Sequence, residues 1–130
     1  MRAIDTSVLV RLMTRDDDRQ VPLAEQALAE KDLISLPTVL LETEWVLRAI
    51  YHLPRDRITE ALQTVCNQDN IIVVSPFAVA AALATYADEG DFGDLLHAAL
   101  AAEFGATEIV TFDKGFLSPA GTAAPSLLGR

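Results

Sequence analysis

The sequence predicts an α/β protein, a three-layer α/β/α sandwich around a central, mostly parallel sheet. Short apolar segments of the strand type alternate with helical patterns along the chain, as is typical of parallel sheets covered by helices. Pairs such as Asn-Gly, which join antiparallel strands in tight hairpins, are absent from the sequence. Because the chain has 130 residues, we expect one domain over residues 1–130.

The first predicted elements are a strand and two helices. Arg2–Asp5 is a short apolar stretch before a polar turn and predicts the first strand. A helix starts directly after Asp5-Thr6-Ser7, where apolar side chains recur at helical spacing, and the acidic run Asp16–Asp18 ends it. The second helix is predicted over Pro22–Lys31, with the proline near its first turn.

The middle of the chain predicts two strands separated by two helices. Leu33–Leu36 is the next short strand, and Pro37 opens a longer helix whose apolar positions continue to Ile50. A further helix is predicted over about Arg55–Asn67. The four β-branched residues Ile71–Val74 predict a strand that is buried on both of its faces.

The last part of the chain repeats this alternation. An Ala-rich helix is predicted from Pro76 to about Ala87, and another from Asp91 to Gly105, a typical helix-ending residue. Ile109–Phe112 predicts a further strand, and Pro125–Leu128 a weak edge strand.

Composition limits the classes of function. With 10 Lys and Arg against 19 Asp and Glu, the formal net charge is −9, which argues against a protein that coats nucleic acid without specificity. No apolar run approaches the roughly 18 residues that cross a bilayer, so we expect no membrane association. The single cysteine, Cys66, permits no internal disulfide and suits a reducing cytoplasm.

Carboxylates fall where a parallel sheet places its functional edge. Asp5 and Asp113 end predicted strands, Asp91 and Asp94 lie in the first turn of a helix, and Glu42 lies about five residues into the Pro37 helix. Helices of such folds begin at the carboxyl edge of the sheet, so these segments can bring their acids to one place. Hard oxygen ligands of this kind suit Mg²⁺ or Mn²⁺, and such a site supports metal-assisted hydrolysis.

Each acid also has a purely structural explanation. Asp91 is a good helix N-cap, and Asp94 is favoured by the helix dipole. Asp5 is an equally suitable cap for the helix after it, and Asp113 precedes Lys-Gly, which is ordinary turn chemistry.

Glu42 is harder to explain by structure alone. Its helical neighbours three and four residues away include no basic side chain. Glu44, by contrast, has Arg48 at i+4, and a surface ion pair explains it. Glu42 is therefore the better functional candidate on this helix.

Four segments together resemble a known family. They are, in chain order, Ile4-Asp5-Thr6-Ser7-Val8-Leu9-Val10-Arg11, Leu41-Glu42 followed by Trp45-Val46-Leu47-Arg48, Asp91-Phe92-Gly93-Asp94, and Thr111-Phe112-Asp113-Lys114-Gly115-Phe116. In this order and spacing, from residue 3 to about residue 117, they resemble the PIN-domain ribonucleases, and among these the VapC toxins of VapBC toxin–antitoxin pairs.

The resemblance implies an endoribonuclease that depends on Mg²⁺ or Mn²⁺. Its acidic ligands here would be Asp5, Glu42, Asp94 and Asp113, with Asp91 as an accessory acid. Many relatives carry Asn at the place of Asp113, which leaves open whether this residue is essential. The resemblance further implies orienting roles for the hydroxyls of Thr6, Ser7 and Thr111, a homodimer, and inhibition by a small antitoxin whose C-terminal segment wraps the toxin near the catalytic groove.

An RNA substrate needs side chains that meet its phosphates. Arg11 and Arg15 recur at helical spacing after the first strand, Lys114 follows Asp113 directly, and Ser7 and Thr111 add hydroxyls near the acids. The alternative for the two arginines is a solvated face, partly neutralised by the neighbouring acidic run.

Other enzyme classes fit less well. A phosphatase of the haloacid dehalogenase type needs a second Asp where Ser7 stands, and a response-regulator receiver needs an Asp where the Ile71–Val74 strand runs into Ser75-Pro76. A Gly-x-Ser-x-Gly elbow is absent. The main alternative to an enzyme is a catalytically silent PIN-like module for protein interaction.

Overall fold

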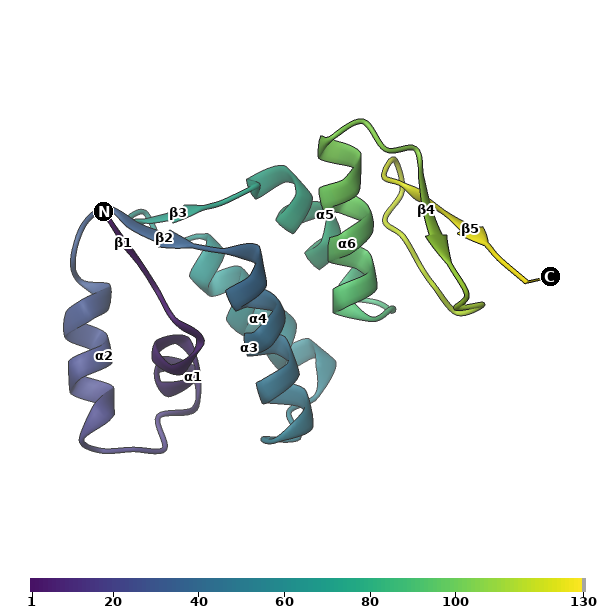
Figure 1. Cartoon of the computed structure of the whole chain (residues 1–130). Coiled ribbons are helices and arrows are strands. Elements are labelled where there is room, and N and C mark those ends of the chain that lie inside the picture. Colours follow the sequence, from purple (N-terminus) through teal and green to yellow (C-terminus); the bar gives the residue numbers. More distant parts are fainter. Residues whose placement is uncertain (130) are drawn as a thin grey trace. The chain divides into compact units, whose positions relative to one another are not determined.

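A computed structural model describes residues 1–129 of the chain and confirms the α/β class with parallel strands (Figure 1). The chain divides into two compact units. Unit 1 covers Met1–Val74, and unit 2 begins at Ser75. Among the described residues, no helix is long and apolar enough to cross a membrane.

Unit 1 contains a three-stranded parallel sheet. Its strands are β1 (Arg2–Ala3), β2 (Leu33–Ser35) and β3 (Ile71–Val73), in the spatial order β1-β2-β3. Ala3 pairs with Ile34, which in turn pairs with Ile72. Because the strands are parallel, their carboxyl ends lie at one edge of this sheet, and Asp5 follows β1 at that edge.

Four helices complete unit 1: α1 (Thr6–Thr14), α2 (Gln20–Leu28), α3 (Pro37–Ala49) and α4 (Arg55–Cys66). Helix α1 packs against α2 and α3, and α3 packs against α4. Each contributes apolar side chains at helical spacing to a core whose most buried members are Leu9, Leu40, Leu47, Ile58 and Leu62.

Two details of unit 1 differ from the sequence prediction. Helix α2 begins at Gln20 rather than at Pro22, because the Asp17 carboxylate accepts the backbone N–H groups of Arg19 at 2.9 Å and of Gln20 at 3.0 Å. Strand β3 is not buried on both faces, since Ile72 is 49% exposed. Its β-branched residues are those of a strand, but only alternate ones face the unit's core.

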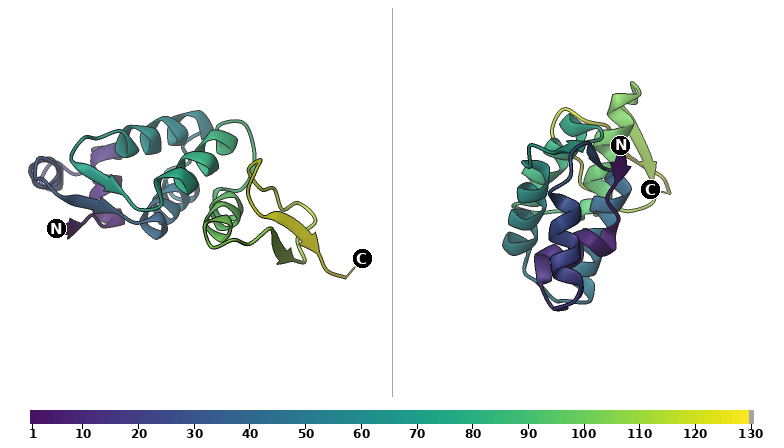
Figure 2. Two further views of the ribbon diagram at one scale, coloured as in Figure 1. Left: turned by 90° about the horizontal axis from the view of Figure 1, so that it is seen from above. Right: turned by 90° about the vertical axis from the view of Figure 1, so that its left-hand side faces the viewer.

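Unit 2 contains two helices and a two-stranded parallel sheet. Helices α5 (Pro76–Tyr86) and α6 (Phe92–Glu103) pack against each other, with the rings of Tyr86 and Phe92 edge to face at 5.3 Å. Strands β4 (Glu108–Thr111) and β5 (Ala124–Leu127) lie side by side (Figures 1 and 2). The weak edge strand predicted at the C-terminal end is therefore confirmed, one residue earlier than expected.

Candidate active site

Asp5 occupies the N-cap position of α1 but does not cap it with its side chain. Its backbone carbonyl accepts the N–H groups of Val8 and Leu9, while its exposed carboxylate accepts a hydrogen bond from Ser7 Oγ at 3.0 Å. The structural explanation of the Asp5 side chain as a helix cap is therefore wrong. The hydroxyl of Ser7 instead orients one carboxylate oxygen, which leaves the other available to a ligand.

Glu42 and Glu44 lie on different faces of α3. Glu42 is exposed and has no hydrogen-bond or ion-pair partner among the described residues. Glu44 Oε2 lies 2.8 Å from Arg48 Nε, which confirms the predicted ion pair. Its predicted surface position is wrong, because Glu44 is only 2% exposed. Helix α3 starts at Pro37, directly after β2, and thus at the same sheet edge as Asp5.

Asp91 is the N-cap of α6. Its Oδ2 accepts the backbone N–H of Asp94 at 2.9 Å, which confirms the capping explanation. Burial, followed by the charges of Asp91 and Asp113, raises the pKa of Asp94, and His97 opposes this shift. Three acids of unit 2 therefore lie close enough to repel one another, and a bound cation would relieve that repulsion.

Asp113 shapes the turn after β4. Its Oδ1 accepts the backbone N–H of Gly115 at 2.8 Å, and its own N–H donates to Thr111 Oγ1 at 3.0 Å. The turn explanation is thus confirmed, but it uses one carboxylate oxygen, and Oδ2 has no hydrogen-bond partner among residues 1–129. The Thr111 hydroxyl therefore contacts the backbone of Asp113 and not its carboxylate. Lys114, the next residue in the chain, is exposed.

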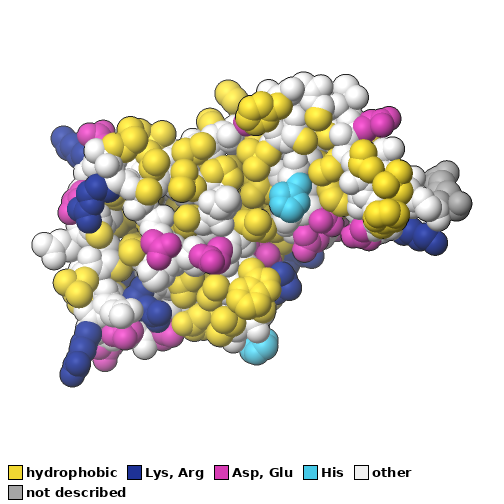
Figure 3. Space-filling view, in the orientation of Figure 1, with side chains coloured by type: hydrophobic (Ala, Val, Ile, Leu, Met, Phe, Trp, Pro, Cys, Tyr) yellow, Lys and Arg dark blue, Asp and Glu magenta, His cyan; other side chains and the backbone are white. Residues whose placement is uncertain are grey.

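The two candidate arginines are paired with acids. Arg11 forms an ion pair with Asp16, and Arg15 NH2 lies 2.8 Å from Glu25 Oε1. A hydrogen bond from the Tyr51 hydroxyl, at 2.7 Å, is the main cause that lowers the pKa of Asp16 to about 2. On the face shown in Figure 3, basic side chains of unit 1 lie beside acidic ones. Both arginines are therefore neutralised. Arg15 is exposed, as the alternative predicts, but its partner Glu25 lies outside the acidic run, and the Arg11 side chain is only 22% exposed.

The predicted acids are distributed over both units. Asp5 and Glu42 belong to unit 1, and Asp91, Asp94 and Asp113 belong to unit 2. Within the part of the chain that the structure describes, no group of three or more His, Cys, Asp or Glu side chains stands in a metal-holding arrangement. The donor set itself is made of carboxylates, whose hard oxygens fit Mg²⁺ or Mn²⁺.

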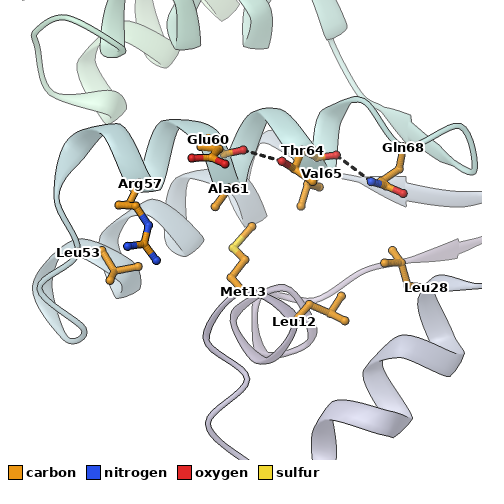
Figure 4. Close-up of a pocket in the computed structure, with 10 residues that line it drawn as sticks. All are labelled: Leu12, Met13, Leu28, Leu53, Arg57, Glu60, Ala61, Thr64, Val65 and Gln68. Atoms are coloured by element: carbon orange, nitrogen blue, oxygen red, sulfur yellow. Dashed lines mark hydrogen bonds between the residues drawn. The ribbon is translucent and has the colours of Figure 1, made fainter.

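Unit 1 contains a cavity of about 290 Å³. Met13 projects from α1 and Ala61 from α4 toward it, and Arg57 and Glu60 lie along α4 (Figure 4). Its lining includes none of the predicted acids. The cavity therefore gives no support to the assignment of these acids.

The chain has a parallel α/β fold with carboxylates after strands β1 and β4 and at the start of α6. The chain belongs to the PIN domain family, whose match spans residues 3–121 and so includes parts of both units. PIN domains are generally nucleases and usually use divalent metal ions. Comparisons with curated proteins and with solved structures gave no significant match.

Proposed function

We propose that this chain is an endoribonuclease that depends on Mg²⁺ or Mn²⁺ and acts as the toxin of a type II toxin–antitoxin pair of the VapBC kind. One observation carries the proposal. The segment that matches the PIN family contains acids whose side chains contribute little to the stability of the fold. The Asp5 carboxylate caps no helix, Glu42 has no partner among the described residues, and Asp94 sits among like charges. A raised carboxylate pKa next to like charges, as at Asp94, is typical of functional sites.

In this proposal, Asp5, Glu42, Asp94 and Asp113 hold one or two divalent ions. Bound there, such an ion would supply an activated water and offset the negative charge of a phosphodiester. Ser7 orients the Asp5 carboxylate. The other positioning contacts belong to unit 2.

Two contacts in unit 2 position acids for the same purpose. The Asp91 cap fixes the backbone of Asp94 in the first turn of α6, and Thr111 fixes the backbone of Asp113. Loss of such supporting contacts weakens metal binding or activity by about 10- to 100-fold in well-studied sites. We therefore assign Asp91 and Thr111 a positioning role.

The remaining parts of the proposal concern assembly and context. We propose one PIN domain formed by the whole chain, a homodimer, a cytoplasmic location and a small antitoxin as partner. The net charge of −9 supports an antitoxin whose binding segment is basic.

Cleavage of cellular RNA by the purified, antitoxin-free protein tests the proposal. Wild type is expected to cut with Mg²⁺ or Mn²⁺ and not after chelation, and Asp5→Asn and Asp94→Asn are expected to be inactive. Asp18→Asn and Asp88→Asn remove exposed acids outside the proposed set and serve as controls, one in each unit.

The outcome also separates the enzyme from the silent interaction module. An interaction module would cut no RNA with either metal and would still bind a protein partner. If Asp5→Asn cuts as fast as wild type, the metal mechanism proposed here is wrong even where the protein is a nuclease.

A further inference from the structure

A groove of about 410 Å³ lies beside Asp113 in unit 2. Lys114 and Phe116, from the turn after β4, line it together with Pro125 and Leu127 from β5. This volume lies within the range of small-ligand sites. The groove therefore adjoins a carboxylate that we assign to the metal site, but its other lining residues have no part in that assignment.

The walls of this groove are fixed by the backbone. Gly115 donates its N–H to Asp113 Oδ1, and Phe116 donates its N–H to the Asp113 carbonyl at 3.2 Å, so the turn is closed around Lys114. Pro125 and Leu127 are alternate residues of β5 and share one face of the strand. The groove is thus built on a turn and a strand of defined geometry.

Lys114 supplies a positive charge that the protein does not neutralise. Arg2, Arg11, Arg15 and Arg48 each form an ion pair, whereas Lys114 is exposed and has no ion-pair partner among the described residues. In a chain with an excess of acids, an unpaired lysine next to a proposed metal ligand is well placed to meet an anion. A phosphate group is the anion that an RNA strand would bring there.

Phe116, Pro125 and Leu127 give the groove an apolar side next to this cation. Proteins bind single-stranded RNA by combining a phosphate contact from a basic residue with a base stacked on an aromatic ring. The groove presents both components, and a single nucleotide is the ligand that uses both.

We propose that this groove is a nucleotide subsite next to the cleavage site, in which Lys114 contacts a substrate phosphate and Phe116 stacks with a base against Pro125 and Leu127. The inference rests on the proposed function, because it takes RNA as the substrate. It extends that function by assigning side chains that bind the nucleotide beside the scissile bond.

The test uses the full-length protein with Lys114→Gln and Phe116→Leu. Phe116→Leu keeps an apolar side chain but removes the stacking ring. Lys31→Gln and Phe104→Leu are matched controls, since both side chains are exposed and neither lines the groove. Binding of a short, fluorescein-labelled, mixed-sequence single-stranded RNA is measured by anisotropy over a salt series, in an Asp94→Asn background that does not cut.

Removal of one phosphate contact reduces the slope of log affinity against log salt by about 0.7 for a single strand. We expect this change for Lys114→Gln and none for Lys31→Gln. Loss of stacking weakens binding by about 5-fold or more, and we expect this for Phe116→Leu but not for Phe104→Leu.

Unchanged salt slope and unchanged affinity in both groove variants, with a wild type that cuts RNA, would overturn the subsite and leave the proposed function intact. A changed oligomeric state with unchanged RNA binding would make the groove a protein contact and would also overturn it. If wild type neither binds nor cuts RNA, both proposals fail. Should Phe116→Leu not fold, the salt slope of Lys114→Gln decides.

Discussion

Replacing Asp91 separates its role as a helix cap from any role in metal binding. Alanine at this position removes the hydrogen bond from the Asp94 N–H, 2.9 Å long in the structure, and loss of an N-cap side chain costs about 1 kcal/mol. The change also removes a charge that raises the pKa of Asp94, and relief of a like-charge pair returns about 0.2–0.5 kcal/mol. We therefore expect Asp91→Ala to lower the free energy of unfolding by about 0.5–0.8 kcal/mol.

Asp91→Ser is expected to leave the stability nearly unchanged. Serine caps a helix about as well as aspartate, so this variant should unfold within about 0.5 kcal/mol of wild type. Urea unfolding followed by circular dichroism, at neutral pH and without metal, measures both values. Asp88→Ala, an exposed acid just before α6, is the control. Equal losses for the alanine and serine variants, or no loss for either, would refute the capping argument.

The same pair of variants reports on catalysis. If Asp91 acts through its cap alone, Asp91→Ser should cut RNA at nearly the wild-type rate, while Asp91→Ala is slower because Asp94 is less well held. A serine variant with wild-type stability and no cleavage would instead show that the Asp91 carboxylate itself takes part in metal binding.

Three further predictions follow from contacts of the other acids. Ser7→Ala removes the hydrogen bond to Asp5 and should reduce cleavage by about 10-fold without changing the urea midpoint; a wild-type rate would contradict the positioning role. Because Tyr51 lowers the pKa of Asp16 to about 2, Asp16 contributes stability above its usual value of 3.8, and this contribution is lost as pH falls to about 2. Asp16→Asn should therefore flatten the stability loss over that pH range, as measured by urea midpoints. Because the pKa of Asp94 is raised, protons compete with the metal for this carboxylate, and Mn²⁺ affinity should rise with pH. In the metal-free protein, the free energy of unfolding should fall as pH rises through that pKa. A Mn²⁺ affinity that does not change with pH would argue against Asp94 as a ligand.

Local signals in the sequence were sufficient for most of the elements. Hydrophobic periodicity, prolines at helix starts and β-branched runs place strands and helices within about three residues of their observed bounds. Helix α2 starts earlier than predicted because the Asp17 carboxylate accepts two backbone N–H groups at its start. Asp17 is polar and therefore lies outside the apolar pattern from which the helix was predicted. The exposure of Ile72 could not be predicted, because residue type shows that a strand forms but not which of its faces is covered.

The candidate site was predictable in part. The ion pair of Glu44 with Arg48 could be predicted from their i,i+4 spacing, because both residues lie on one helix. The partners of Arg11 and Arg15 depend on how the chain turns after α1, where Arg15 adopts a left-handed conformation with φ 52°, and no periodic pattern encodes that turn. The groove beside Asp113 could not be predicted, because two of its lining residues belong to β5. Only the pairing of β5 with β4 brings them close to Asp113.

The proposal depends most on Asp5 and Asp94 as ligands of the divalent metal. Calorimetric titration of the metal-free protein with Mn²⁺ tests it most directly, with Asp5→Asn from unit 1, Asp94→Asn from unit 2, and Asp88→Asn as control. We expect either of the first two variants alone to abolish the Mn²⁺ binding seen in wild type, and the control to bind normally. Wild-type Mn²⁺ binding in Asp5→Asn or in Asp94→Asn would contradict it.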